Sequence, residues 1–302
     1  MKKFLIRTLV FIVLATIVMM VLDLCLSHKL RQRQVGPYAC WTDIFHGRIT
    51  ADLVIMGSSR AWVHYDPTIL DSVLHTNSYN LGVDGSAFNR QYTRYLLYRK
   101  YNPKPRIIIQ NIDFTTLGFT SGYDQYQYFP YFNDSDVRHT IIPYEQFTLA
   151  DRTLPFYRYA NFGLQQLFSN QSISVKGYSS KEKDWEVGPI EKGIWTDYAA
   201  DSRTMAMFEE FLAQATAEDI QVIFVHAPIY SELTKYQNGL DEMWNTYRQL
   251  AAKYHIPILN YQNDPICSDT NYFYNRTHLN RKGAELFSRQ LANDLKKRNL
   301  LN

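Results

Sequence analysis

Short apolar runs, separated by turn residues and amphipathic stretches, follow one another along the chain from Ala51 onward. Five of these runs have the length of buried strands: Asp52–Met56, Ser78–Leu81, Arg106–Ile112, Gln221–Val225 and Ile256–Leu259. Helical periodicity follows most of them and is clearest in residues 87–101 and 243–255. Strands that alternate with helices form βαβ units with parallel strands. The pattern therefore predicts an α/β domain with five parallel strands in a doubly wound sheet.

A much longer apolar run stands at the N-terminus, from Thr8 to Leu26, and only Asp23 interrupts it. It follows a basic start, MKKFLIR, and is long enough to span a bilayer as a helix. A cleaved signal peptide is the competing interpretation, but the run exceeds the usual apolar region of such peptides and no Ala-x-Ala site follows it. We therefore expect residues 1–27 to form an uncleaved transmembrane helix.

The orientation of this helix follows less directly from charge, because basic residues flank both of its ends: Lys2, Lys3 and Arg7 before it, Lys29, Arg31 and Arg33 after it. We expect a cytoplasmic N-terminus, with the remainder of the chain outside the cytoplasm or in the periplasm. A lipoprotein signal at Cys25 is disfavoured, because Leu24 stands where a small residue is needed.

The remaining chain divides into a polar juxtamembrane linker, residues 28–50, and the α/β domain, residues 51–302. Residues 115–203, between the third and fourth predicted strands, are too long for a simple crossover and are crowded with aromatic residues. This insertion is either a helical cap that buries its own aromatic side chains or a substrate-binding wall over the strand ends. The second interpretation follows from the rule that ligands bind at the carboxyl ends of parallel strands.

Composition excludes several classes of function. The chain has 302 residues, 46% of them hydrophobic, and a net charge of +3 without a basic stripe, so nucleic acid is not expected as a partner. No HExxH, CxxC or carboxylate cluster is present, so neither a metal nor another cofactor is expected. Of the three cysteines, Cys25 lies in the apolar run, and Cys40 and Cys267 are either a disulfide or two free thiols.

The most informative short motif is Gly57-Ser58-Ser59, which follows the first predicted strand and opens a helix. Backbone N–H groups converge at such a turn, and a serine hydroxyl there is exposed for nucleophilic chemistry. The stretch is not the G-x-S-x-G elbow of α/β-hydrolases, because Ala61 replaces the second glycine. Taken alone, the motif is better explained by Ser58 or Ser59 as the cap of the helix.

Two further stretches accompany this motif: NLGVDG, residues 80–85, and FYNRTHLNRKGAELFS, residues 273–288. Together the three resemble the SGNH, or GDSL-like, hydrolase superfamily, and within it the membrane-anchored cell-envelope branch of DltD-like and alginate-acetylation proteins. The resemblance implies a three-layer α/β/α sandwich of the flavodoxin-like kind, with strand order 2-1-3-4-5. It also implies that Ser59 is the nucleophile, His278 the base and Gly85 an oxyanion donor.

The sequence departs from this superfamily at two points. The triad aspartate falls on Asn275, which can orient the imidazole of His278 but cannot stabilise the imidazolium by charge. Three alternatives follow: the site works as a Ser-His dyad, or a nearby carboxylate such as Asp269 takes the place of the aspartate, or catalysis is weak. The oxyanion asparagine is best matched by Asn111, close to Asp113, whose carboxylate would repel an oxyanion.

Three functions of different classes follow from these features. The first is a serine esterase or O-acyltransferase that acts on acyl groups of cell-envelope glycans, with a multi-pass membrane O-acyltransferase as a potential partner. The second is a catalytically silent SGNH-like domain that binds a glycan or such a partner, which Asn275 favours. The third is a purely structural membrane-tethered interaction protein, which requires Ser59 and His278 to lie far apart.

Overall fold

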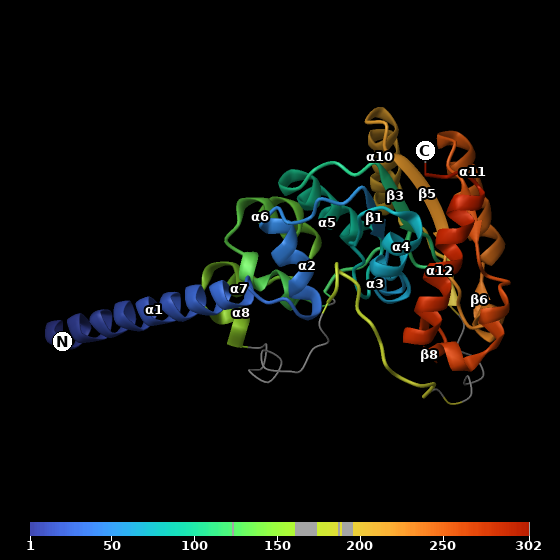
Figure 1. Cartoon of the computed structure of the whole chain (residues 1–302). Coiled ribbons are helices and arrows are strands. Elements are labelled where there is room, and N and C mark those ends of the chain that lie inside the picture. Colours follow the sequence, from blue (N-terminus) through green and yellow to red (C-terminus); the bar gives the residue numbers. More distant parts are fainter. Residues whose placement is uncertain (123, 161–173, 187, 189–195, 302) are drawn as a thin grey trace. The chain divides into compact units, whose positions relative to one another are not determined.

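The computed structural model describes residues 1–122, 124–160, 174–186, 188 and 196–301 (Figure 1). The chain forms two compact units. The first combines Met1–Thr42 with Ser121–Gln171, and the second combines Asp43–Thr120 with Ser172–Asn302. This division differs from the boundaries expected from the sequence, because residues 28–50 are shared between the units and contain the helix α2, Gly36–Phe45.

The second unit contains the expected sheet. Its five strands are parallel in the order β2-β1-β3-β5-β7, which confirms the predicted order 2-1-3-4-5 and the α/β fold class. Their bounds are β1 Leu53–Met56, β2 Ser78–Asn80, β3 Ile107–Asn111, β5 Gln221–His226 and β7 Ile258–Asn260. Every residue of β1 and β3 is buried, as expected for central strands covered on both faces.

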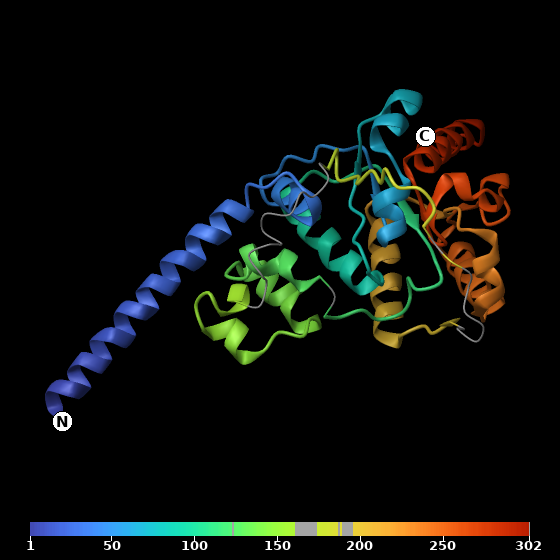
Figure 2. The same ribbon diagram turned by 90° about the horizontal axis from the view of Figure 1, so that it is seen from below.

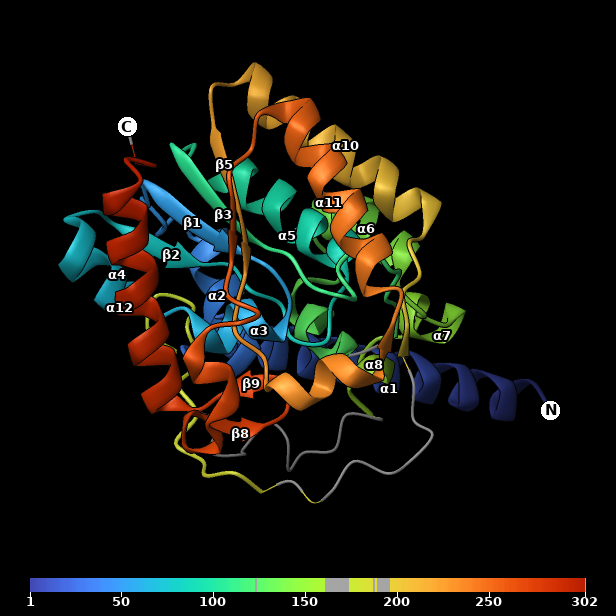
Figure 3. The same ribbon diagram turned by 90° about the vertical axis from the view of Figure 1, so that its right-hand side faces the viewer.

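Helices cover both faces of this sheet and complete a three-layer arrangement (Figure 3). One face carries α3 Ser59–His64, α4 Pro67–Leu74 and α12 Arg281–Lys297. The other carries α5 Phe88–Tyr101, α10 Ser202–Ala217 and α11 Leu240–Tyr254. On the first face, Ile55 and Ile109 of the sheet share a buried cluster with Phe287 of α12. On the second, Phe208 packs edge-to-face on Phe88 with ring centroids 4.5 Å apart.

Short elements at the strand ends shape the loops of the second unit. Residues Thr196–Asp197 (β4) pair in parallel with Gln237–Asn238 (β6), and Phe273–Asn275 (β8) pairs antiparallel with His278–Leu279 (β9). Three short 3₁₀ helices are also present: η3 Ser231–Tyr236, η4 Pro265–Ser268 and η5 Thr270–Tyr272. The β8–β9 hairpin directly precedes α12 and carries His278.

The first unit is helical. After α1, Lys2–Leu30, and α2 it contains η1 Gln125–Tyr131, α6 Ser135–Thr140, η2 Ile142–Tyr144, α7 Leu149–Thr153 and α8 Tyr157–Ala160. Aromatic side chains of the predicted insertion are buried here; Trp41 contacts Tyr128 edge-on and donates a hydrogen bond of 2.9 Å to Gln127. Residues 121–160 thus bury several of their own aromatic side chains.

The helix α1 is one continuous element (Figure 2) and, in the part of the chain that the structure describes, the one helix long and apolar enough to cross a membrane. Its mean hydropathy over the best window is 2.9, and large apolar side chains are exposed from Phe4 to Leu24. Length and composition alone fit a membrane span or a signal sequence. The C-terminal turns differ, because Asp23, Ser27 and Leu30 form a buried face.

That buried face fixes the end of α1 within the first unit. Asp23 forms an ion pair with Arg158 at 2.5 Å, and both side chains are at most 5% exposed. The backbone N–H of Phe156 also donates to Asp23 at 2.8 Å, and the hydroxyls of Ser27 and Tyr159 lie 2.8 Å apart. The interruption of the apolar run at Asp23 therefore has a structural cause: the carboxylate is a buried partner of residues far along the chain.

Candidate active site

Ser59 and His278 meet at the carboxyl end of the parallel sheet. Ser59 is the first residue of α3, directly after β1, and His278 opens β9 just before α12. The Oγ atom of Ser59 lies 2.7 Å from Nε2 of His278. This is hydrogen-bond distance, so the third function, which required the two residues to lie far apart, loses its premise.

The turn before Ser59 requires glycine. Gly57 has φ +153°, a backbone conformation that other residues rarely adopt, and a Cβ atom there would lie 2.6 Å from Cβ of Ala61. This close approach lets the chain leave β1 and enter α3 at once, which places Ser59 at the edge of the sheet. Small residues in this turn are therefore needed for the position of the nucleophile.

Ser58 has a structural role that separates it from its neighbour. It is the N-cap of α3, and its Oγ accepts a hydrogen bond from the backbone N–H of Arg60 at 3.4 Å. The same hydroxyl donates to Asp113 at 2.7 Å and is buried. Of the two serines in the motif, only Ser59 is bonded to the imidazole of His278.

The hairpin that holds His278 is organised by Asn275. Its side-chain Oδ1 accepts from the backbone N–H groups of Thr277 at 3.0 Å and His278 at 2.9 Å, a hydrogen-bonded turn typical of asparagine. The same oxygen lies 3.0 Å from Nδ1 of His278. Because an amide oxygen only accepts, this contact favours the tautomer with a proton on Nδ1 and leaves Nε2 free to accept from Ser59.

Thr277 is a second neighbour of the imidazole that the sequence did not single out. Its Oγ1 lies 2.8 Å from Nδ1 of His278 and donates to Asn275 at 3.0 Å. Its position next to His278 is the only sequence signal that could have suggested this contact. Asp269, considered from sequence as a substitute carboxylate, instead accepts from the backbone N–H of Asn271 and caps η5.

The surroundings of His278 favour its neutral form. Burial lowers the pKa of the imidazole to about 4; the charges of Arg60 and Lys181 act in the same direction, whereas Asp113 opposes them. The ring of Tyr274 stacks on the imidazole with centroids 5.4 Å apart and an interplanar angle of 6°. His278 is thus available as a base over a wide pH range, but neither of the described residues that contact Nδ1, Asn275 and Thr277, carries a negative charge.

A cavity of about 360 Å³ opens beside the two residues. Ser59, His278 and Gly85 line it, together with the apolar side chains of Phe114, Ile229 and Leu233. Its polar lining includes Ser86, Asp113, Thr115, Thr120, Gln237 and Thr277. A cavity of this size that joins a nucleophile to an apolar wall can accept the acyl part of an ester.

Of the two expected oxyanion residues, Gly85 lines the cavity and Asn111 does not. Gly85 lines the cavity in a left-handed conformation, φ 58°, and Ser59 opens a helix whose first N–H groups lack intrahelical partners. Asn111 is completely buried, accepts from the Tyr65 hydroxyl at 2.7 Å and donates to Asp113 at 3.3 Å. These bonds hold its amide inside β3 and away from the cavity lining, which counts against Asn111 as an oxyanion donor.

The carboxylate of Asp113 is held by neighbours rather than left free. It accepts from Ser58, from the backbone and hydroxyl of Thr115, and from the hydroxyl of Thr116. The buried guanidinium of Arg60 donates to the carbonyl of Ala227, and Asp113 opposes the lowering of its pKa by burial. Arg60 and Asp113 therefore place two opposite charges in the lining of the cavity that contains Ser59.

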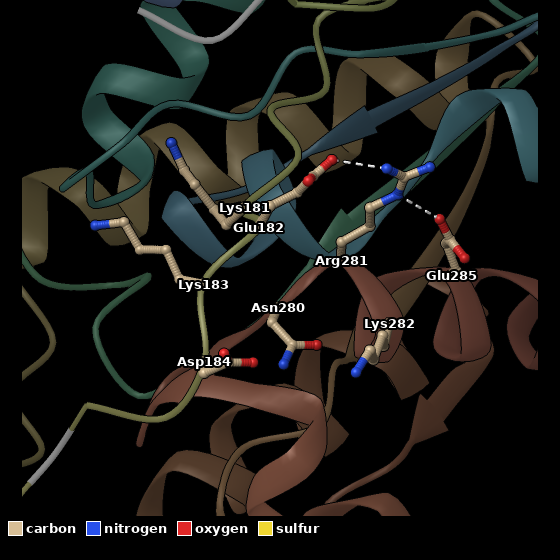
Figure 4. Close-up of a pocket in the computed structure, with 8 residues that line it drawn as sticks. All are labelled: Lys181, Glu182, Lys183, Asp184, Asn280, Arg281, Lys282 and Glu285. Carbon is tan, nitrogen blue, oxygen red and sulfur yellow. Dashed lines mark hydrogen bonds and ion pairs between the residues drawn. The ribbon is translucent and has the colours of Figure 1, made fainter.

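A second, more polar cavity of about 470 Å³ lies between residues 181–184 and the first turns of α12 (Figure 4). Arg281 bonds to Glu182 and Glu285, each at 2.7 Å, whereas Lys181 and Lys183 point away from these pairs (Figure 4). The ammonium of Lys181 lies 4.5 Å from the ring centroid of Trp62, and its charge reaches His278. Lys181 therefore lines this second cavity and also lowers the pKa of His278 by its charge.

The described residues contain no group of three or more His, Cys, Asp or Glu side chains arranged to hold a metal ion. All three cysteines are free thiols, so Cys40 and Cys267 form no disulfide. The thiol of Cys267 instead donates to the carbonyl of Tyr261 at 3.2 Å. Of the two alternatives left open by the sequence, the structure contains the free thiols.

No family model matches the sequence, and a search of curated proteins finds no match. Among solved structures, a protein from Streptococcus pneumoniae described as a platelet activating factor is 12% identical, with a TM-score of 0.42 over 95% of this chain and 99% of its own. A GDSL-like lipase from Bacteroides thetaiotaomicron is 12% identical, with a TM-score of 0.38 over 80% and 87% of the two chains. A Chitinophaga pinensis protein described as a lipase is 9% identical, with a TM-score of 0.41 over 82% and 98%. At this level of similarity, function has to be inferred from the site geometry.

Proposed function

We propose that the protein is a serine esterase or O-acyltransferase of the SGNH type, with Ser59 as nucleophile and His278 as general base. The observation that carries this proposal is the 2.7 Å contact between Ser59 Oγ and His278 Nε2. A serine hydroxyl is a weak nucleophile near neutral pH and needs a base at this distance. The open cavity beside Ser59 supplies room for an acyl group.

The reaction follows from the placement of these groups. Nε2 of His278 takes the hydroxyl proton as Ser59 Oγ bonds to the carbonyl carbon of the ester, and the resulting oxyanion faces the N–H groups of Ser59 and Gly85. The imidazolium then gives its proton to the leaving alkoxide, and the acyl group stays on Ser59. Water or a hydroxyl of an acceptor, deprotonated by the same imidazole, attacks this acyl-enzyme and regenerates Ser59.

The role of Asn275 in this scheme is orientation. Its oxygen holds Nδ1 of His278 at 3.0 Å and thereby fixes the tautomer, but it adds no charge to stabilise the imidazolium. We expect a reaction slower than that of an enzyme with a carboxylate in this position. This feature also supports a second candidate function: a catalytically silent SGNH-like domain that binds a glycan or a membrane acyltransferase.

We infer that the substrates are acyl groups of cell-envelope glycans. The support is the apolar N-terminal helix, which would hold the second unit at a membrane surface where such glycans are found. A multi-pass O-acyltransferase in the same membrane is the proposed partner, as donor or recipient of the acyl group.

We also infer that α1 is an uncleaved anchor. Cleavage after the apolar run would remove Asp23 from Arg158, whose guanidinium is 4% exposed, and leave a buried charge unpaired. A signal sequence that is cleaved off does not form a buried ion pair with the mature protein. We propose that the N-terminus is cytoplasmic and the rest of the chain lies outside. Protease added to intact spheroplasts should then digest the body of the protein, and complete protection would contradict this topology.

Activity on small acyl esters tests the enzymatic proposal. Ser59→Ala and His278→Ala should each lower kcat/KM by at least about 10²-fold, and the double variant should lose little more because the two residues act as one unit. Ser58→Ala is the matched control and should lose much less, since Ser58 caps α3. If the wild-type protein hydrolyses no ester and transfers no acyl group, the binding-domain proposal takes precedence.

A further inference from the structure

Exposed large apolar side chains outside α1 gather in one short segment of the first unit. Among the described residues that follow α1 there are five, and three of them, Leu149, Leu154 and Tyr157, fall within nine residues. Leu149 is 75% exposed and Leu154 is 53% exposed. Leucines this exposed and this close together are typical of a surface that contacts an apolar partner.

The segment borders α1 where the exposed apolar surface of that helix ends. Met20 and Leu24 of α1 line a cavity of about 220 Å³ together with Leu154 and Pro155, which follow α7. The labels of α1, α7 and α8 mark this region in Figure 1. At this level Asp23 is buried against Arg158. If the run before Asp23 spans the hydrocarbon, the α7–α8 segment lies at the boundary between hydrocarbon and headgroups.

The contacts of α1 with α8 and the residue before it fix the position of the α7–α8 segment relative to α1 within the first unit. Asp23 bonds to Arg158 and to the backbone N–H of Phe156, and Ser27 bonds to Tyr159 one turn later. These bonds lie on one face of α1 and fix its rotation. The exposed leucines therefore lie in a segment that is bonded directly to α1.

Basic groups line the same cavity at the level of the headgroups. Arg138, Arg152 and Arg158 all border it, but of these only Arg158 forms an ion pair with a described residue. Asp151, beside Arg152, is occupied as a capping partner of Thr148. A planar guanidinium binds phosphate oxygens in a bidentate manner, so two exposed arginines beside an apolar edge fit the phosphates of a lipid surface.

We propose that α7 and the turn into α8 rest on the phospholipid bilayer beside α1. Leu149, Leu154 and Tyr157 lie in the interfacial layer, and Arg138 and Arg152 bind lipid phosphates. The proposal rests on the membrane anchoring of α1 proposed above. A second attachment next to a single helix restricts the tilt of the first unit and so limits how far it moves from the membrane surface.

Lipid contact can be measured directly on the full chain in nanodiscs of phosphatidylcholine and phosphatidylglycerol. In a Cys25→Ser background, where the two remaining cysteines are buried, a fluorescent label is placed on Leu154→Cys or Leu149→Cys. Val13→Cys in α1 reports on the anchor itself, and Leu286→Cys, an exposed leucine of α12, is the control for a label on an apolar surface position. Lipids with a quencher near the headgroup then report contact as a loss of fluorescence.

The proposal predicts quenching at Leu149 and Leu154 and none at Leu286. In the Arg138→Gln, Arg152→Gln double variant, quenching at Leu154 should fall while that at Val13 stays unchanged; undiminished quenching at Leu154 would overturn the role of the arginines. If Val13 is in contact with lipid but Leu149 and Leu154 remain open to an aqueous quencher, the lipid-contact proposal is wrong and the anchor stands. If Leu149 and Leu154 are shielded from both quenchers, a protein covers them instead of lipid, and this result also overturns the lipid-contact proposal. If Val13 too remains open to the aqueous quencher, the anchoring proposal itself fails.

Discussion

Asn275 and His278 lie three residues apart on one hairpin, and the amide oxygen of Asn275 is 3.0 Å from Nδ1 of the imidazole. The contact has the geometry of the aspartate–histidine contact in a serine hydrolase triad, but Asn275 lacks the negative charge of the aspartate. Burial and the nearby cations lower the pKa of His278 to about 4, so the imidazole is neutral at physiological pH. The base is therefore correctly placed but weak, and this combination determines how the site should respond to pH.

The Asn275→Asp variant should shift the acid side of the pH–rate profile upward. The reaction needs neutral His278, so wild-type activity should stay high above about pH 4 and fall as the pH drops through the pKa of about 4. A carboxylate at position 275 favours the imidazolium and raises the pKa of His278, so half-maximal activity should move to higher pH. At neutral pH the rate should hold or rise, because the imidazolium formed in the transition state gains a charged partner.

The control for this variant is Asn271→Asp, which adds the same charge at an exposed position of η5. Its pH profile should match that of the wild type. A lower rate for Asn275→Asp at neutral pH, with an unchanged fold by circular dichroism, would show that another group already serves as the acid. Asp269→Asn would then be the next variant to measure.

The buried pair between Asp23 and Arg158 should make a large contribution to the stability of the first unit. Asp23→Ala leaves an unpaired buried guanidinium, and we expect a loss of about 3–5 kcal/mol in the free energy of unfolding of this unit. Hydrogen–deuterium exchange over residues 125–160 in detergent measures the loss. Glu209→Ala breaks the exposed pair with Lys253 and should cost far less, because solvent screens this pair.

A double replacement distinguishes the charge from the packing. Asp23→Leu combined with Arg158→Met removes both charges and should recover much of the lost stability. If Asp23→Ala alone has no effect on exchange in the first unit, α1 does not belong to the folded unit and the argument for an uncleaved anchor fails.

Much of the second unit could be predicted from the sequence, because its signals are local. Each strand is a short apolar run bounded by turn residues, and the resemblance of the three short motifs to the SGNH superfamily implied the strand order. The placement of Ser59 after the first strand and of His278 before the last helix followed from short motifs. Ser59 directly follows β1, whereas His278 lies in the β8–β9 hairpin that precedes α12.

The remainder depends on contacts that no local pattern contains. Arg158 is the partner of Asp23 across 135 residues, and Gln127 is the partner of Trp41 across 86. Nothing in the sequence around Asn111 indicates that Tyr65 and Asp113 hold its side chain inside the sheet. Charged and polar groups such as these are placed by the whole fold, so their partners became visible only in three dimensions.

The cysteines should titrate as three thiols in denaturant without reductant, because Cys40 and Cys267 are free. In the folded protein, Cys267 should react slowly, since burial raises the pKa of its thiol to about 11. Titration with a thiol-specific chromophore before and after unfolding measures both quantities. A single reactive thiol in the unfolded, unreduced protein would indicate a Cys40–Cys267 disulfide and contradict the structure.

The central claim is that His278 activates Ser59, and covalent labelling with a fluorophosphonate tests it most directly. The probe reacts only with a serine whose hydroxyl proton is removed by a neighbouring base, and peptide mass spectrometry identifies the modified residue. We predict an adduct on Ser59 in the wild-type protein, none on Ser58, and loss of the adduct in His278→Ala. Absence of labelling at Ser59 in the folded wild-type protein, together with no turnover of any acyl ester, would contradict the account and leave a binding domain in its place.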